Sequence, residues 1–411
     1  MNISNKRWVY LIVGVISMLF AGVIYAWSIL KVPLGEDLGW DSTQLALNFT
    51  ITMGMFCIGG ILGSLIPKKL GVKLTMIFAG CLCGFGFILT SFLSSEQLGL
   101  LYITFGVMGG LGVGIVYNVL VTTLNAWFPD KKGLCSGCMM LGFGFSTMAL
   151  GTVCNQLFHS VGWRSTYLFL GIAVGIVLVI AGIIIKKTDA SFDRAYAEWS
   201  RTQEVKSPGK ETLSVKSFSP KEMLKSSLFW RAFLFIVFAT VVGNCVASFA
   251  KDVSLFTGAS DNLATTMVGI FAVCNGISRI VIGILFDAVG RRTTMILCSI
   301  MTIATSLVLI ATALTNSLPL CVVGLCMSGL TMGISPTVGA VIARLLFGDR
   351  YYPTNYGITN CNLLFASFMA TFASGLVSTT GGYLAPFLIF LVLSIAGLIL
   401  NLSINKKETT T

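Results

Sequence analysis

Long, nearly continuous apolar runs separated by short polar segments make up most of the chain. A helix needs about 20 apolar residues to cross a bilayer, whereas a transmembrane strand alternates apolar and polar residues over about 10 positions. The runs here do not alternate, so the pattern predicts an all-α membrane protein with twelve transmembrane helices. We expect the spans at residues 8–30, 45–67, 73–93, 98–127, 133–157, 164–186, 228–250, 263–286, 292–314, 318–347, 354–378 and 383–404.

One polar stretch, residues 187–227, is too long to be an ordinary connection between two spans. It is rich in charged residues and Ser, and it contains no apolar run that could cross a membrane; an amphipathic helix is an option over 192–199. The sequence therefore predicts an N-terminal six-helix half (1–186), a polar linker (187–227) and a C-terminal six-helix half (228–411).

The composition excludes several classes of protein. Of the 411 residues, 55% are hydrophobic and 10% are charged, and the mean hydropathy is +0.89. An ordinary soluble domain has about 25% charged residues, and a disordered chain is polar, so neither class fits. The 12 cysteines lie mostly in apolar runs. Cys135 and Cys138 are three residues apart, but the His or carboxylate ligands of a metal site do not accompany them.

The basic residues are divided unevenly between the two predicted ends of the helix bundle. Of the 27 Lys and Arg residues, only Lys31, Arg164 and Lys251 fall in the connections at one end. All the others except Arg279 fall at the end that holds both termini and the linker. The positive-inside rule then predicts a multi-pass protein of the plasma membrane with its termini and linker in the cytoplasm. This basic belt accounts for most of the net charge of +11, so we expect the lipid bilayer as a partner and no nucleic acid.

Three sequence matches at one offset indicate an internal duplication. The motif Gly-Leu-x-x-Gly-Ile at 110–115 recurs at 329–334, Phe-x-Asp at 128–130 recurs at 347–349, and the loop at 70–76 matches 289–295. Because the halves keep the same topology, an axis along the membrane normal should relate them.

The predicted loop between spans 8 and 9 resembles the loop motif of the major facilitator superfamily. This resemblance implies a two-half carrier fold and a gating loop that latches the cytoplasmic side. An Asp near a helix end can pair with Arg and with helix-terminal N–H groups, which is a physical basis for such a latch. The equivalent loop at 67–73 keeps the Gly and the basic residues but lacks the Asp, and simple charge topology is the alternative explanation. The motif residues are Gly283, Asp287, Gly290, Arg291 and Arg292.

A narrower resemblance is to the oxalate–formate antiporter and monocarboxylate transporter group. It rests on Tyr-Ala-Trp-Ser at 25–28, on Gly-x-Gly-x-x-Tyr at 112–117, on Trp-Phe-Pro-Asp-Lys-Lys-Gly at 127–133 and on Asn-Gly-x-Ser-Arg at 275–279. It covers nearly the whole chain except the linker. The resemblance implies a carrier of small organic anions.

Arg279 is the most informative single residue of the sequence. It lies eight residues before Asp287 inside an apolar span, so it is about 12 Å from the end of that helix. An arginine at membrane depth costs about 2.5 kcal/mol or more, and all 16 acidic residues fall in loops, span ends or the linker. We therefore expect its partner to be the cargo, a carboxylate bound by the guanidinium. The alternative is that backbone carbonyls and water satisfy it.

Four further residues are candidates for substrate binding, namely Asn275, Tyr117, Tyr25 and Asn362. Asn275 lies one turn before Arg279 and cannot titrate, so proton coupling through a carboxylate at this position is not expected. Exchange for a counter-transported anion, facilitated diffusion and a proton carried with the substrate stay open. Oxalate–formate antiporters of this group carry a Lys in span 11. Here the equivalent region holds Asn362 and Leu363, which favours a monoanion such as lactate, pyruvate or formate over oxalate.

The rival functions make different demands on the sequence. An enzyme would need a catalytic set of acids or a His-rich metal site within the membrane, and the chain has one His, His159, and no acid in mid-span. We therefore expect no enzyme, no metal and no cofactor. The two alternatives that remain are an oxalate–formate (dicarboxylate) exchanger and a neutral-solute or multidrug transporter on the same fold. A drug exporter would not need Arg279.

Overall fold

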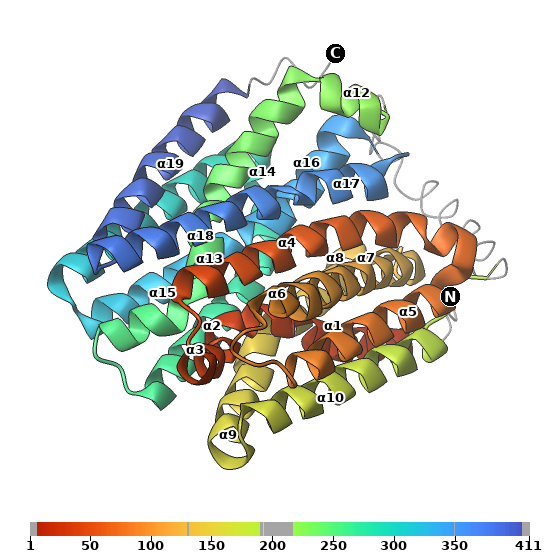
Figure 1. The fold of residues 1–411 in the computed structure, drawn as a ribbon. Coiled ribbons are helices and arrows are strands. Elements are labelled where there is room, and N and C mark those ends of the chain that lie inside the picture. Colours follow the sequence, from red (N-terminus) through yellow and green to blue (C-terminus); the bar gives the residue numbers. More distant parts are fainter. Residues whose placement is uncertain (1–5, 130, 190–191, 193–216, 349, 405–411) are drawn as a thin grey trace.

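The computed structural model describes residues 6–129, 131–189, 192, 217–348 and 350–404, and the described residues form helices joined by short connections (Figure 1). Twelve of its helices are long and apolar enough to cross a membrane, which confirms the predicted fold class. Each helix end lies within six residues of the predicted one. The short helices α3 (Val32–Leu38) and α12 (Pro220–Lys225) lie outside the spans.

The spans are built from the following elements, in chain order: Lys6–Leu30 (α1 Lys6–Ala21, η1 Gly22–Ala26, α2 Trp27–Leu30), Ser42–Leu65 (α4), Pro67–Thr90 (α5), Leu98–Trp127 (α6 Leu98–Leu101, η2 Tyr102–Gly109, α7 Gly110–Trp127), Leu134–Val161 (α8 Lys132–Ser146, η3 Thr147–Gly151, α9 Thr152–Val161), Trp163–Ile184 (α10), Ser227–Phe256 (α13), Asp261–Phe286 and Ala288–Thr315 (both within α14, Asp261–Thr315), Leu318–Phe347 (α15 Leu318–Met332, α16 Ile334–Phe347), Thr354–Thr380 (α17 Tyr352–Asn360, α18 Asn362–Thr380) and Leu384–Ser403 (α19).

The first six spans and the last six spans pack in the same way. Span 1 contacts span 5, span 2 contacts span 4 and span 3 contacts span 6, and the same three pairings recur among spans 7 to 12. Between the two groups, α4 lies against α18 and α14 lies against α8, so the cross contacts also follow a twofold pattern. In Figure 1 the first six spans, red to yellow-green, lie at the lower right and the last six at the upper left.

The two halves also share backbone conformations at equivalent turns. Gly71 (φ 74°) and Gly290 (φ 78°) are both in a conformation that side-chain-bearing residues rarely adopt, and they are equivalent residues of the two repeated loops. In each case one residue breaks an otherwise continuous helix. The predicted loop between spans 8 and 9 is therefore a single-residue break in α14 and not an extended connection. Two further glycine pairs with positive φ have the same spacing: Gly39 with Gly258, and Gly162 with Gly381.

Helix backbones also approach each other closely at equivalent positions of the two halves. A Cβ atom on Gly114 of α7 would clash with the backbone carbonyl of Phe56 in α4. At the equivalent position of the second half, a Cβ on Gly333 would meet the side chain of Ser278 and the carbonyl of Asn275 in α14. Small residues let helix backbones approach in this way, and they hold spans 2 and 8 close to spans 4 and 10.

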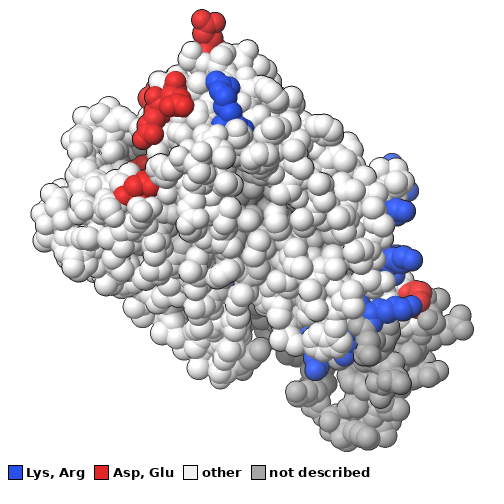
Figure 2. Space-filling view, turned by 90° about the horizontal axis from the view of Figure 1, so that it is seen from below, with Lys and Arg blue, Asp and Glu red and all other residues white. Residues whose placement is uncertain are grey.

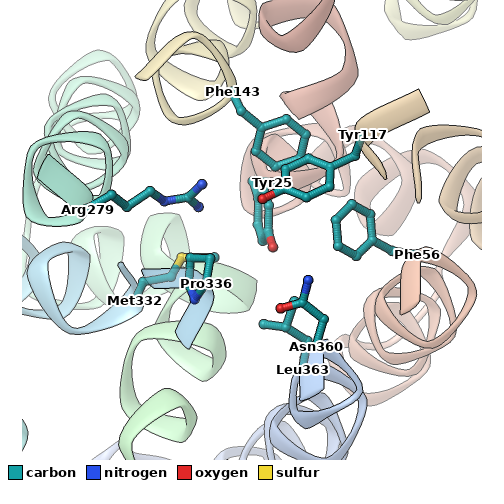
Figure 3. Close-up of a pocket in the computed structure, with 9 residues that line it drawn as sticks. All are labelled: Tyr25, Phe56, Tyr117, Phe143, Arg279, Met332, Pro336, Asn360 and Leu363. Carbon is teal, nitrogen blue, oxygen red and sulfur yellow. The ribbon is translucent and has the colours of Figure 1, made fainter. Parts of the chain in front are cut away.

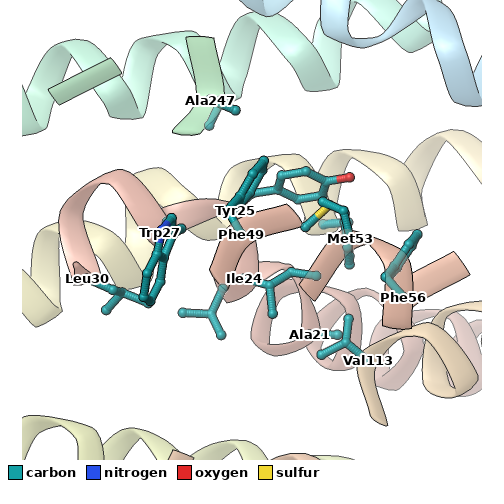
Figure 4. Close-up of a cluster of buried hydrophobic side chains, with 14 of the residues drawn as sticks. Ala21, Ile24, Tyr25, Trp27, Leu30, Phe49, Met53, Phe56, Val113 and Ala247 are labelled. Carbon is teal, nitrogen blue, oxygen red and sulfur yellow. The ribbon is translucent and has the colours of Figure 1, made fainter. Parts of the chain in front are cut away.

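The buried core is continuous across the boundary between the two halves. Figure 4 shows Ala247 of α13 beside a cluster from the first half that includes Trp27, Phe49 and Phe56. Trp27 is fully buried and donates its indole N–H to the carbonyl of Leu45 at 2.9 Å. By contrast, many large apolar side chains are exposed on the outside of the bundle, as expected of a surface that faces lipid.

The charges separate to the two ends of the bundle (Figure 2). We call one end the acidic end; it holds Glu36, Asp37, Asp41, Glu96, Asp252 and Asp261. The opposite, basic end holds Lys68, Lys69, Lys73, Arg291 and Arg292. Most of the predicted linker, including the helix expected over 192–199, lies outside the described residues apart from Phe192, and the domain boundaries stay a prediction.

Candidate substrate site

A small cavity lies between the two halves, and its lining comes from both (Figure 3). Its volume is about 20 Å³, which is room for roughly one water molecule. The cavity is mainly apolar and aromatic, with a few polar groups directed inward, which is typical of a small-molecule site. The lining residues are Tyr25, Phe56, Tyr117, Phe143, Arg279, Met332, Pro336, Asn360 and Leu363.

Three of the spans that form the cavity are irregular beside it. Span 1 tightens into a 3-10 helix over Gly22–Ala26, the segment that carries Tyr25. Span 10 is interrupted at Gly333 and span 11 at Cys361, and residues that line the cavity flank both interruptions. A short 3-10 stretch within a longer helix often marks a functional hinge, so these breaks concentrate adjustable backbone at the cavity.

Arg279 reaches the cavity from α14, where the sequence predicts the main anchor of the site (Figure 3). Only 7% of the residue is exposed. Its Nε donates to Asn275 Oδ1 at 3.3 Å, and its Nη1 donates to Met140 Sδ at 2.9 Å. Within the described part of the chain Arg279 makes no ion pair, so this buried cation has only an amide oxygen and a thioether as hydrogen-bond acceptors.

Tyr25 and Tyr117 lie on the opposite side of the cavity from Arg279, and in Figure 3 their hydroxyls point into it. Tyr117 donates to Met140 Sδ at 3.0 Å. Both tyrosine rings pack edge to face on Phe143, with ring centroids 5.5 Å and 5.2 Å apart, and Tyr117 packs in the same way on Phe56. This aromatic packing holds the two hydroxyls in place.

Two of the predicted binding residues do not line the cavity: Asn275, which accepts a hydrogen bond from Arg279, and Asn362, which is held by three hydrogen bonds of its own. Asn362 Oδ1 accepts from Ser335 at 2.7 Å and from Thr240 at 3.3 Å, and its Nδ2 donates to the Thr359 carbonyl at 2.7 Å. These bonds tie spans 7, 10 and 11 together. Asn360, two residues earlier, takes the cavity position instead.

The structure adds site residues that the sequence gives little reason to select. Met140, Asn360 and Phe143 are uncharged, and similar residues are frequent in the helix packing of a membrane protein. Leu363 lines the cavity from span 11, so this span brings no cation to the site.

Of the predicted gating loop, Gly290 forms the break in α14, Arg291 is partly buried and Arg292 is exposed, and the side chain of Asp287 lies outside the described atoms.

Two linkages of buried lysines close the acidic end of the bundle. Lys31, after span 1, forms an ion pair with Asp252 of α13, with 2.5 Å between Nζ and Oδ2. Lys251 of α13 is 2.7 Å from Asp261 of α14, and it also donates to Asn155 of α9 at 2.8 Å. Asn155 donates in turn to Asp261 at 2.9 Å. Both linkages therefore join the N-terminal half to the C-terminal half.

Hydrogen bonds made by hydroxyl groups also join the two halves between the acidic end and the cavity. Thr50 of α4 donates to the carbonyl of Ser367 at 2.5 Å and lies 2.8 Å from the hydroxyl of Thr371, both in α18. Closer to the cavity, the Cys57 thiol donates to the carbonyl of Asn360. Among the described residues, the hydrogen bonds between the halves run from the level of the cavity to the acidic end.

This architecture, with two equivalent six-helix groups around a central cavity, is that of a membrane carrier. The chain belongs to the major facilitator superfamily, whose family model matches residues 9–257 and 244–410. It is a transporter and not an enzyme. The resemblance seen in the loop motif is thereby confirmed at the level of the family.

Individual relatives are distant but cover most of the chain. The sequence is 26% identical to the uncharacterized MFS-type transporter YhjX of Escherichia coli (strain K12), over 87% of this chain and 85% of that protein. It is 25% identical to the oxalate:formate antiporter of Oxalobacter formigenes (96% and 90% covered) and 26% identical to mouse (Mus musculus) monocarboxylate transporter 12 (85% and 75% covered). The structure of a D-xylose-proton symporter superposes with a TM-score of 0.75 at 15% identity, over 98% of both chains, which shows the shared fold.

Proposed function

We propose that this protein carries small monocarboxylates of the lactate, pyruvate or formate type across the membrane by alternating access. The observation that carries the proposal is Arg279, a cation buried in a cavity between the halves without an ion-pair partner among the described residues. A planar guanidinium matches a carboxylate in geometry and charge. A bound anion would complete the site, because a buried charge is stable only when it is paired.

The other cavity residues support a monoanion. Tyr117 and Asn360 supply neutral polar groups, and Leu363 supplies an apolar contact at span 11. One cation neutralises one carboxylate, whereas a dicarboxylate would keep an unpaired charge in a site of low dielectric constant. The relatives support a carboxylate in general terms, since one is an oxalate:formate antiporter and others are monocarboxylate transporters. Oxalate–formate exchange is the second candidate for this reason.

The orientation follows from the charges. We place the basic end, with both termini, in the cytoplasm of a plasma-membrane protein, because basic residues favour the cytoplasmic side. The acidic end then faces outward and is held closed by its two lysine linkages. The loop with Asp287, Gly290, Arg291 and Arg292 lies at the cytoplasmic end, where it would latch the halves when the outer end opens.

Purified protein can test the proposal with ligand-induced thermal stabilisation, followed by uptake into liposomes. Formate, lactate and pyruvate are compared with oxalate, succinate and a neutral sugar, because only ligands of the native state raise its melting temperature. Arg279→Gln should abolish both stabilisation and uptake. Without ligand, its melting temperature should equal or exceed that of the wild type, since the substitution removes a buried charge with weak acceptors.

Two matched variants sharpen this test. Arg279→Lys keeps the charge but loses the two-pronged donor geometry, so it should retain weak binding. Lys221→Gln, an exposed position in α12, removes the same charge far from the cavity and should behave like the wild type. Wild-type uptake by Arg279→Gln would refute the anchor. Stabilisation by oxalate alone would favour the dicarboxylate exchanger, and stabilisation by the sugar alone would favour a neutral-solute transporter.

A further inference from the structure

Two buried donors of the cavity converge on one sulfur atom. Arg279 Nη1 and Tyr117 Oη lie 2.9 Å and 3.0 Å from Met140 Sδ. Arg279 comes from the second half of the molecule, and Tyr117 and Met140 come from the first. A thioether is a weak acceptor, so a guanidinium and a phenol that both point at it are poorly satisfied. Their convergence marks one position where a stronger acceptor, such as a carboxylate oxygen, would gain two hydrogen bonds.

The Met140 sulfur occupies the position at which the two donors converge, and the cavity that Arg279 and Tyr117 line is small. Its volume of about 20 Å³ is that of roughly one water molecule, and even formate has three non-hydrogen atoms. A carboxylate oxygen can accept from both of these donors only when Met140 moves. The rings of Tyr25, Tyr117, Phe56 and Phe143 are packed against one another. Met140 is partly exposed and unbranched, so its flexible chain can change rotamer.

We propose that Met140 is a stand-in ligand, whose sulfur holds the place of one carboxylate oxygen in the empty carrier and leaves when the substrate binds. This inference rests on the proposed function, because it requires a carboxylate at Arg279. The displaced sulfur makes Met140 an internal competitor that sets the affinity of the site. The incoming oxygen would accept from Arg279 of one half and Tyr117 of the other, so the substrate would bridge the two halves.

Two substitutions of opposite character test the competition. Met140→Leu removes the acceptor at similar volume, so the empty site loses a weak interaction and lactate or formate should bind roughly three- to tenfold more tightly. Met140→Gln places a stronger acceptor, an amide oxygen, at the end of a chain of similar length, and binding should weaken by a similar factor. Met139→Leu is the control, because Met139 is fully buried and the hydrogen bonds of Arg279 in the described part of the chain go to Asn275 and Met140. Dissociation constants are measured by isothermal titration with each anion.

A role in packing alone would shift both variants in the same direction, or neither, and either result would overturn the inference. A second arm uses no ligand: the ε-methyl resonance of Met140 in methyl-labelled protein should shift in Arg279→Gln and in Tyr117→Phe. An unmoved resonance in both variants would also overturn it. If no anion binds the wild-type protein, both the proposed function and the stand-in role fail. If the wild type binds normally and both Met140 variants bind with unaltered affinity, only the stand-in role is refuted.

Discussion

Asp252→Asn should loosen the acidic end of the carrier, because it leaves a buried ammonium group without its counter-charge. The Lys31 side chain is 4% exposed and that of Asp252 is 30% exposed. Removal of one partner from a fully buried pair costs about 3–5 kcal/mol, and an exposed pair contributes about 0–1 kcal/mol. This half-buried pair lies between these limits, at about 2–3 kcal/mol.

The cost applies only while the acidic end is closed, since Lys31 regains water when the halves separate there. The equilibrium between closed and open forms should therefore shift toward the open form by roughly 30- to 150-fold. Lys31→Gln should have a smaller effect, because the carboxylate that it leaves is already in contact with solvent. The double variant should fall between the two. The Lys251–Asp261 linkage is intact in all three variants, so none should lose the closed form entirely.

Chemical labelling can follow this opening. Ser248 lies one turn before Asp252 in α13 and is fully buried, so Ser248→Cys would react with an impermeant maleimide only when the acidic end opens. Each variant is compared with the same variant carrying Ser248, which corrects for the 12 native cysteines. Asp252→Asn should raise the labelling rate at least tenfold over Ser248→Cys alone. An unchanged rate in folded protein, or a larger effect from Lys31→Gln, would refute the reasoning.

Two other predictions concern packing and the site. Gly114→Ala should lower the melting temperature and the folded yield, because its methyl group would clash with the Phe56 carbonyl; Gly60→Ala, in open space on α4, is the control and should be neutral. Loss of activity with unchanged stability in Gly114→Ala would contradict this. Asn362→Ala should destabilise the protein, since it breaks three hydrogen bonds, and leave KM little changed, whereas Asn360→Ala should alter KM with little loss of stability. A changed KM in Asn362→Ala together with lost stability in Asn360→Ala would show that the two roles are assigned the wrong way round.

The sequence predicts the fold well because the relevant signals are long and repetitive. Twenty apolar residues in succession leave few options in a bilayer, since every backbone group must be hydrogen-bonded within its helix. The duplication is visible in short motifs, and the structure matches it in the glycines at 71 and 290. Arg279 is predictable for the same reason: an arginine in an apolar span with no acid near its depth is a strong local contrast.

The remaining site residues could not be predicted because their roles depend on which helix faces which. Asn360 and Asn362 are two residues apart and so face nearly opposite sides of a helix, and the packing of span 11 against its neighbours decides which amide reaches the cavity. Lys31 and Lys251 stand out as two of the few basic residues at the acidic end. Their partners, however, lie in other spans, and a sequence does not give the distances between spans.

The charge of the site bears on how the carrier would be coupled. Empty, the cavity holds one cation with an amide and a thioether as acceptors, and sealing it at both ends would bury that cation away from water. A bound monocarboxylate would neutralise it, so the loaded carrier would pass through the sealed form at lower cost than the empty one. If the proposed function holds, exchange of one anion for another should therefore be faster than net transport. The thioether of Met140 would lessen this difference without removing it, because a weak acceptor satisfies a guanidinium only in part.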